Sequence, residues 1–269
     1  MILSVKKWIF SKIQERNYDL TRGISKQRML DFLTKIYPRK TKYDLIRMGA
    51  EADGGYLVPN NLMGISTCYS PGVSDISEFE KACMDLGMKV YMADKSVSGP
   101  NLNKNEFNYE FLKKHIGCIN SDEYITMDNW IRGTTTQTES DLMLQMDIEG
   151  FEYAAIINIT EEMLKKFRII IIEFHSFESI WHPHFFNIIE LTFSKILRYH
   201  SVVHIHPNNS GGSIFKNNIT IPEVMEFTFL RNDSGVLGEY VTEFPHPLDR
   251  DNIKGKSLIL SNDCFQSNI

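Results

Sequence analysis

The chain has 269 residues, of which 42% are hydrophobic, 12% aromatic and 23% charged, and its formal net charge is −5. This composition is that of a water-soluble globular protein, and it excludes disordered, collagen-like and low-complexity classes. The acidic balance argues against a nucleic-acid binder, and four scattered cysteines without a C-x-x-C pair favour a reducing, cytoplasmic location. Because no apolar run approaches the roughly 20 residues of a spanning helix, we expect neither a membrane span nor a signal peptide.

Residues 1–45 form a basic segment. Eleven basic and four acidic residues give this segment a net charge of +7 and leave −12 for residues 46–269. Apolar residues interleave with lysines in residues 3–13, which predicts an amphipathic N-terminal helical arm. Two uses of the arm remain open: packing on its own domain or on a second copy, and peripheral contact with an anionic membrane or an acidic partner.

Beyond the arm, short apolar runs alternate with helical patterns. Strands are predicted at residues 66–73, 89–93, 141–146, 168–172, 202–206 and 226–230, and helices at residues 75–87, 126–131, 151–166 and 185–199. Weaker patterns indicate loop and helix at 101–114, a short strand at 115–118, a loop at 207–218, and an edge strand or strap at 257–260. The alternation predicts an α/β fold with a mostly parallel, doubly wound sheet and helices on both faces.

The first predicted strand runs into a turn that is suited to a ligand. In such sheets, ligands bind beyond the carboxyl ends of the strands, near the point where the strand order reverses. Gly72 lies in the segment Tyr69-Ser-Pro-Gly-Val-Ser-Asp75, where it lets the backbone approach a ligand. The segment lacks the glycines of a pyrophosphate loop, so a cofactor without a phosphate at this point fits better than a nicotinamide dinucleotide. Asp94 ends the second strand, where an acid either accepts both hydroxyls of an adenosine ribose or is an ordinary surface residue.

Acidic side chains and a histidine follow the two central strands. Asp147 and Glu149 end the first of these strands, and Glu173 and His175 end the next. Because burying an unpartnered carboxylate is costly, we expect each acid to be hydrogen-bonded, paired with a cation, or facing a cleft. The competing interpretation is a helix cap at Asp147 and a salt bridge at Glu149 or Glu152.

Six of the eight histidines lie between residues 175 and 206. His204 and His206 share one face of a predicted strand, where they can act as metal ligands, as a base or as substrate contacts. His200 and His204 have H-x-x-x-H spacing, but this spacing straddles a helix end and a strand, so it does not predict a metal site.

Together, several of these segments resemble the FkbM-type methyltransferases over roughly residues 45–249. The matching motifs are Arg47-Met-Gly, Asp53-Gly-Gly-Tyr56, the Tyr69–Asp75 segment with Phe79-Glu80, Met146-Asp-Ile-Glu-Gly150 with Glu152, Ile172-Glu-Phe-His175, His204-Ile-His206 with Asn208-Asn209, and Phe244-Pro-His-Pro-Leu-Asp249. The D-I-E-G-x-E element is the most specific of them. The resemblance implies a Rossmann-like class I fold over residues 46–269 that uses S-adenosylmethionine to methylate a hydroxyl of a sugar, glycan or related metabolite.

This interpretation assigns roles to individual residues. The cofactor-binding residues are then Tyr69, Ser70, Gly72, Asp75, Asp94 and Asp147. The base that takes the hydroxyl proton is His175, His206 or Glu149, and the histidines are favoured because an unperturbed imidazole titrates near about 6.5. No metal ligand is assigned, although a divalent cation that bridges Asp147 and Glu173 is a further option.

Two other functions fit the sequence less well. One is a sugar-modifying enzyme that depends on NAD or a nucleotide sugar, which the missing phosphate loop disfavours. The Tyr-x-x-x-Lys pattern of such enzymes occurs twice. Tyr91 and Lys95 lie on a predicted strand and its exit, so they cannot share the face of a helix. Tyr109 and Lys113 could share one, but they lie in a weakly patterned segment. The other is a catalytically silent binding module that docks through the basic arm.

Overall fold

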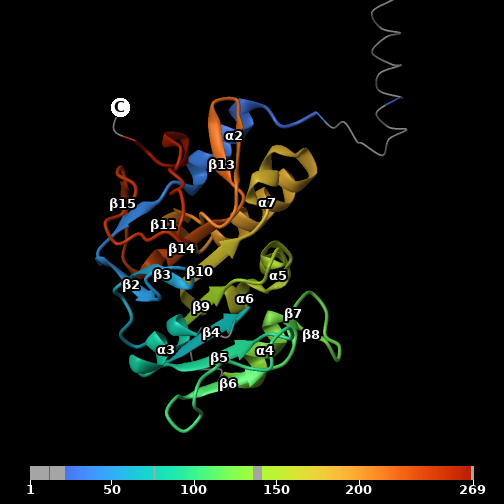
Figure 1. Ribbon diagram of the computed structural model, residues 1–269, viewed down its shortest axis with the longest axis vertical. Helices are drawn as coiled ribbons and strands as arrows, with labels where there is room; N and C mark the ends of the chain where they lie inside the picture. The colour runs from blue at the N-terminus through green and yellow to red at the C-terminus, as the bar shows by residue number, and fades with distance from the viewer. Residues whose placement is uncertain (1–11, 13–21, 75–76, 136–140, 268–269) are drawn as a thin grey trace, which may run out of the picture.

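A seven-stranded β-sheet runs through the centre of the molecule (Figure 1). The computed structural model describes residue 12 and residues 22–74, 77–135 and 141–267. In spatial order the sheet contains β11 (His200–Pro207), β14 (Met225–Arg231), β10 (Phe167–Phe174), β9 (Leu142–Met146), β4 (Thr67–Pro71), β5 (Lys89–Ala93) and β6 (Tyr109–Leu112).

Among the parallel strands, the strand order reverses once, between β4 and β9. The chain first moves outward from β4 through β5 to β6, and it then returns to β9 on the other side of β4. All neighbouring pairs from β10 to β6 are parallel, whereas β14 is antiparallel to both β10 and β11. The sheet is therefore a mostly parallel, doubly wound, Rossmann-like sheet, and its switch point lies at the carboxyl ends of β4 and β9.

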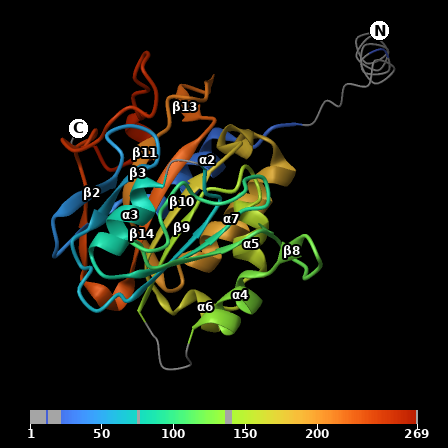
Figure 2. The same cartoon turned by 60° about the horizontal axis from the view of Figure 1, so that its bottom comes forward.

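Each face of the sheet carries its own hydrophobic layer. In β10, Ile170 and Ile172 point into one layer and Ile169 and Ile171 into the other, because successive side chains of a strand alternate between the faces. Figure 2 shows α5 (Glu152–Asn158) and α7 (Pro183–Ile196) on one side, with α3 (Glu78–Asp85) and β3 (Gly55–Pro59) on the other. Burial on both faces explains why these central strands are almost purely apolar.

Smaller elements complete the fold. They are α2 (Lys26–Leu33), α4 (Met127–Thr134), α6 (Glu161–Leu164), β1 (Arg39–Thr41) paired with β15 (Val236–Tyr240), β2 (Leu45–Gly49) paired with β3, β7 (His115–Ile116) paired with β8 (Tyr124–Ile125), β12 (Ser213–Lys216) paired with β13 (Ile219–Pro222), and four short 3₁₀ helices at Thr34–Ile36, Phe177–Trp181, Asn232–Ser234 and Asn262–Cys264.

The structure corrects three predicted segments and decides between the strand and the strap predicted for a fourth. Residues 101–114 contain the edge strand β6 and no α-helix, and residues 207–218 contain β12 rather than loop alone. The single helix predicted at 151–166 is two helices, because the hydroxyl of Thr160 accepts the N–H of Met163 and starts α6 anew. Residues 257–260 form no strand and instead line a cavity as a strap.

The basic segment is packed on the domain from residue 24 onward. Ser25 caps α2, and Met29, Phe32 and Leu33 are buried in the layer that contains α7. Arg28 forms an ion pair with Glu190 of that helix at 3.2 Å. The amphipathic stretch predicted at residues 3–13 lies outside the described residues, apart from the exposed Lys12. Among the helices that the structure describes, none has the length and apolar character that crossing a bilayer requires.

Candidate functional site

A row of charged side chains crosses half of the sheet at its carboxyl edge. His206 of β11 is in register with Glu226 of β14, and Glu226 is in register with Glu173 of β10. Residues in register point to the same face, and neighbouring strands are about 4.8 Å apart. The pairing therefore brings together three side chains from distant parts of the chain, all at most 9% exposed.

The row continues across the switch point. Asp147 follows β9 and Gly72 follows β4, and the N–H of Asp147 donates to the carbonyl of Pro71 at 3.2 Å. Gly72 has φ +85°, and a Cβ built on it would lie 1.4 Å from the carbonyl oxygen of Asp147. Only glycine fits this close approach of the two loops. Asp94 extends the row beyond β5.

These three residues line one cavity of about 260 Å³. Its polar lining includes Asp94 and Asp147 together with Ser96, His115 and Glu149, and its apolar lining includes Ile116 and the ring of Tyr124. One carboxylate oxygen of Asp94 accepts hydrogen bonds from the N–H and the hydroxyl of Ser96, each at 2.6 Å. The structure thus brings three of the six predicted cofactor-binding residues together at the switch point.

The side chains of Tyr69 and Ser70 do not line this cavity, which corrects their expected role. Tyr69 is fully buried in the core, where its hydroxyl lies 2.6 Å from that of Thr134. The buried hydroxyl of Ser70 donates to Glu80 on the opposite layer at 2.5 Å. Both belong to a strand that is buried on its two faces, so neither side chain reaches the carboxyl edge. Asp75 lies outside the described residues.

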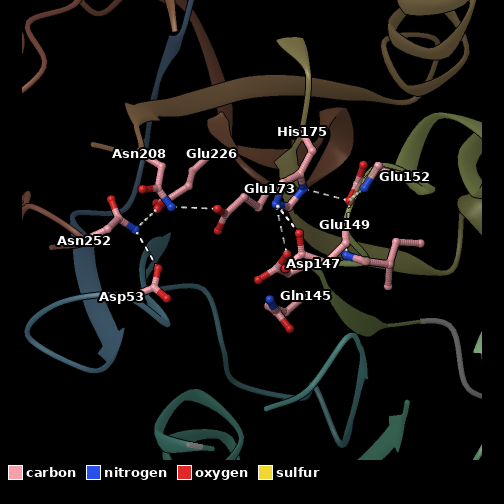
Figure 3. Close-up of polar contacts among 12 residues, drawn as sticks. Asp53, Gln145, Asp147, Glu149, Glu152, Glu173, His175, Asn208, Glu226 and Asn252 are labelled. Atoms are coloured by element: carbon pink, nitrogen blue, oxygen red, sulfur yellow. Dashed lines mark hydrogen bonds and ion pairs between the residues drawn. The ribbon is translucent and has the colours of Figure 1, made fainter. Parts of the chain in front are cut away.

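Glu152 organises the loop that follows β9 (Figure 3). Its side chain is fully buried, and one of its oxygens accepts the N–H groups of Ile148 at 3.1 Å and Gly150 at 3.0 Å. The same oxygen lies 3.0 Å from Nδ1 of His175. Glu152 therefore ties the D-I-E-G loop to the end of β10 and fixes the orientation of the imidazole. The sequence interpretation had included Glu152 in the D-I-E-G-x-E motif, but the one role that it had named for this residue was a salt bridge.

The other ring nitrogen of His175 faces two carboxylates. Nε2 lies 3.8 Å from Oδ1 of Asp147 and 3.4 Å from Oε2 of Glu149. Burial lowers the pKa of His175, but the carboxylates of Glu152, Asp147 and Glu149 outweigh burial and raise it above its usual value. Burial raises the pKa of Asp147 to about 7, although His175 opposes that shift.

A divalent cation between Asp147 and Glu173 finds no support in this geometry. One group of three acidic or histidine ligand atoms within 4.8 Å of one another occurs among the described residues, and it consists of Asp147, Glu149 and His175. Glu173 is not part of it. These three ligand atoms lie close enough together to hold an ion, but without Glu173 they give no support to the predicted bridge.

Amide side chains hold the two acids at the centre of the row (Figure 3). Nδ2 of Asn208 donates to Glu173 at 2.7 Å, and Nδ2 of Asn252 donates to Glu226 at 2.7 Å and to Asp53 at 3.0 Å. Burial, reinforced by the charge of Glu226, raises the pKa of Glu173 to about 10. Sequence reasoning had missed Glu226 and Asn252. The signal for Glu226 was present, since it is the single acid in the otherwise apolar segment 225–230.

His206 ends the row at a second cavity, of about 210 Å³. Its Nδ1 lies 3.7 Å from Asp249, whose carboxylate also contacts Nε2 of His204 at 2.9 Å. Burial raises the pKa of Asp249, but the hydrogen bond from His204 and the nearby imidazole of His206 outweigh burial and hold that pKa well below its usual value. Residues 257–260 and Phe244 form the opposite wall of the cavity.

A comparison with known families identifies the chain. The model of the methyltransferase FkbM domain matches residues 62–200, which is more than half of the sequence. The chain belongs to the FkbM methyltransferase family. The matched region contains Gly72, Asp94, Glu152 and His175, whereas Glu226 and Asp249 of the FkbM protein lie beyond it.

Solved structures resemble this FkbM chain at low identity. The fibrillarin/Nop5p complex aligns with a TM-score of 0.38 and 10% identity, over 63% of this chain and 74% of that one. An rRNA methylase from Streptococcus thermophilus gives a TM-score of 0.36 and 10% identity, over 76% of this chain and 94% of that one. A SAM-dependent methyltransferase from Archaeoglobus fulgidus gives a TM-score of 0.34 and 13% identity, over 64% of this chain and 88% of that one. No curated protein matches the sequence.

Proposed function

We propose that this protein transfers a methyl group from S-adenosylmethionine to a hydroxyl of a sugar, glycan or similar polyhydroxylated metabolite, with His175 as the base. The observation that carries the proposal is the orientation of His175. Its Nδ1 is held by the buried Glu152, and its Nε2 lies beside Asp147, which lines the cavity at the switch point.

The residues around this cavity fit the adenosine part of the cofactor. Asp94 has a fixed carboxylate at the end of the second parallel strand, where the two hydroxyls of a ribose can donate to it. Ile116 and Tyr124 offer apolar and aromatic surface for a flat base. Asp147 and Glu149 supply negative charge for a sulfonium. When bound, S-adenosylmethionine supplies an electrophilic methyl group.

The chemistry left to the protein is orientation and removal of one proton. A cofactor held by Gly72, Asp94 and Asp147 would supply a methyl group to the acceptor oxygen and would leave as a neutral thioether. Nε2 of His175 takes the hydroxyl proton. A cationic cofactor near Asp147 disfavours the imidazolium, so cofactor binding lowers the pKa of His175 toward the range in which it acts as a base.

His175 suits this role better than the two other candidates. The side chain of Glu149 is 86% exposed, so water competes for its carboxylate. His206 lies two strands beyond Glu173, roughly 10 Å along the row at the usual strand spacing. We therefore assign His206 to the acceptor side, where it meets the acceptor together with the amides and carboxylates of the row.

Calorimetry and a methyl-transfer assay test the proposal. We expect S-adenosylmethionine and its demethylated product S-adenosylhomocysteine to bind the wild-type protein with micromolar affinity. His175→Ala should keep that affinity and lose at least about 100-fold in turnover, at the lower end of what general-base catalysis contributes. His184→Ala removes an exposed histidine from α7 and serves as the matched control, with unchanged turnover.

Three results would contradict the assignment. Binding of NAD or a nucleotide sugar in place of S-adenosylmethionine would identify the sugar-modifying alternative. Cofactor binding without turnover on any member of a broad panel of hydroxylated acceptors would favour a silent binding module. Full turnover by His175→Ala would remove the histidine from the base role.

A further inference from the structure

Two buried acids face one another in the acceptor half of the site. Glu173 and Glu226 are direct register partners on antiparallel strands, and they are 4% and 6% exposed. Side chains in this relation have their Cβ atoms about 5 Å apart, and like charges directly opposite each other are destabilising. A proton on Glu173, whose pKa is raised to about 10, relieves this repulsion, and a bound cation would relieve it with both acids ionised.

The protein compensates this pair mainly with neutral donors. Glu173 accepts from Asn208 at 2.7 Å and from the hydroxyl of Tyr56 at 3.5 Å, and Glu226 accepts from Asn252 at 2.7 Å. The strongest charges acting on Glu173 are those of other carboxylates, which belong to Glu226, Asp147 and Asp53. Among the residues that the structure describes, no cationic side chain forms an ion pair with Glu173, whose hydrogen bonds with these residues come from neutral donors.

Cationic groups act on Glu226, the partner of Glu173 in the pair. The guanidinium of Arg47 donates to the backbone carbonyls of Ala50 and Ala52 at 2.7 and 2.8 Å, and its charge acts on Glu226. His206 is beside Glu226 in register and two strands away from Glu173.

His206 also keeps hydrogen-bonding capacity for a ligand. It is 9% exposed, and neither of its ring nitrogens makes a hydrogen bond. Its nearest carboxylate contact is the 3.7 Å separation from Asp249. A buried imidazole without a hydrogen bond is uncommon and, in this position, it offers a polar contact to whatever lies along the row.

A metal ion does not suit the acid pair. A divalent cation needs several converging ligands, and among the described residues Glu173 and Glu226 join no group of three ligand atoms within 4.8 Å. A primary ammonium needs fewer ligands than a divalent cation, because it has one positive charge and three N–H donors. Such a group can donate to both carboxylates at once and supply the missing charge.

We propose that the acceptor is an amino sugar or amino alcohol whose ammonium group lies between Glu173 and Glu226. The inference rests on the proposed methyl transfer and narrows its substrate class. A hydroxyl on one side of the ammonium is then directed toward His175, which follows Glu173 by two residues. A second polar substituent on the other side contacts the free ring nitrogens of His206.

A matched pair of small probes tests the ammonium requirement. Serinol and glycerol share one three-carbon skeleton, and serinol has an ammonium group where glycerol has its central hydroxyl. Their affinities for the protein saturated with S-adenosylhomocysteine are measured at pH 7 by ligand-observed NMR, and soaked crystals locate them. We expect serinol to bind at least tenfold more tightly, with its nitrogen between Glu173 and Glu226.

Charge-neutral variants supply the control. Glu173→Gln should reduce the preference for serinol to within twofold while the affinity for glycerol stays the same, and Glu226→Gln provides a second variant should the first fail to fold. Glu110→Gln removes an acid of β6 whose side chain is 58% exposed, and it should leave the preference intact.

Several outcomes overturn the proposal. Equal affinity of serinol and glycerol would overturn it, as would crystals in which neither probe, or a divalent cation, lies between Glu173 and Glu226. A preference for serinol that persists in both glutamine variants would overturn it as well. The titration of S-adenosylhomocysteine alone decides the proposed function separately. If that titration fails, the serinol preference is measured on the protein without cofactor.

Discussion

The two halves of the charged row differ in what they offer a ligand. On the cofactor side, Gly72 lets the backbone of β4 approach that of Asp147, and Asp94 is the one acid at the end of β5. On the acceptor side, the ligand-facing groups are the side chains of β10, β14 and β11 and of the loops that follow them. Under the proposed function, the first half would recognise shape and a ribose through fixed backbone geometry, whereas the second would recognise charge and hydroxyl pattern through side chains.

This difference implies that a mutation in one half changes the binding properties of that half and leaves those of the other half intact. A change on the cofactor side should affect the binding of S-adenosylhomocysteine, and a change on the acceptor side should affect turnover and acceptor affinity. His175 and Glu152 lie at the junction, so they should affect turnover without affecting either ligand strongly.

Gly72→Ala is the change with the largest expected effect. The added Cβ would overlap the carbonyl of Asp147, so the two loops must separate and the binding of S-adenosylhomocysteine should fall by more than about 100-fold. Gly87→Ala is the control, because Gly87 has nearly the same φ, +86°, and nothing within 4 Å of its built Cβ. It should lower the free energy of unfolding by about 1 kcal/mol and keep cofactor affinity. Equal binding losses in both variants would show that the close approach is unimportant.

Glu152→Gln should reduce kcat about 10- to 100-fold with little change in cofactor affinity. Removing the buried carboxylate also lowers the pKa of His175, because Glu152 is the main group that raises it. The acid limb of the kcat/KM profile should therefore move to lower pH in the variant. An unshifted limb would leave Glu152 with a structural role only, through its bonds to the N–H groups of Ile148 and Gly150.

Asp94→Asn tests the ribose contact. The amide offers one acceptor where the carboxylate offers two, so the affinity for S-adenosylhomocysteine should fall roughly tenfold, which corresponds to about 1.4 kcal/mol. The relative affinities of serinol and glycerol should not change. A variant with wild-type cofactor affinity in calorimetry would exclude Asp94 from the cofactor site.

The stability of the acceptor side should depend on Asp249. Its folded-state pKa is lowered below the unfolded value, so its ionised form stabilises the fold above the unfolded pKa, and this contribution is lost as pH falls through the folded pKa. Asp249→Asn should lower the free energy of unfolding by about 1.5–3 kcal/mol at pH 7, because it removes the charge-assisted hydrogen bond with His204 and the negative charge that His206 faces. The difference from wild type, measured by urea denaturation, should shrink in acid. A difference that does not depend on pH would contradict this role.

The cofactor half could be predicted from the sequence more completely than the acceptor half. Gly72, Asp94 and Asp147 each follow a strand that the pattern identified, and the rule for parallel sheets then brings them to one edge. The sequence pattern did not show that the side chains of Tyr69 and Ser70 remain in the core. Because β4 is buried on both faces, its residues show no periodicity that would distinguish core side chains from exposed ones. The strand at β6 was missed because its burial is only partial.

The acceptor half depends on pairings that no local pattern reveals. Glu226 meets Glu173 and His206 only because β14 runs antiparallel between β10 and β11. Asn252 reaches Glu226 from a segment without helix or strand. The central role of Glu152 follows from three contacts to one carboxylate oxygen, and spacing alone did not distinguish it from a surface salt bridge.

The central claim is that one row brings the methyl donor and the acceptor hydroxyl together beside His175. A crystal structure of the protein with S-adenosylhomocysteine tests it most directly. The account predicts ribose hydroxyls on Asp94, the sulfur atom beside Asp147, and open space between that sulfur and Nε2 of His175 for one acceptor oxygen. A nucleoside bound away from Asp94, or a sulfur atom on the far side of the sheet from His175, would contradict it.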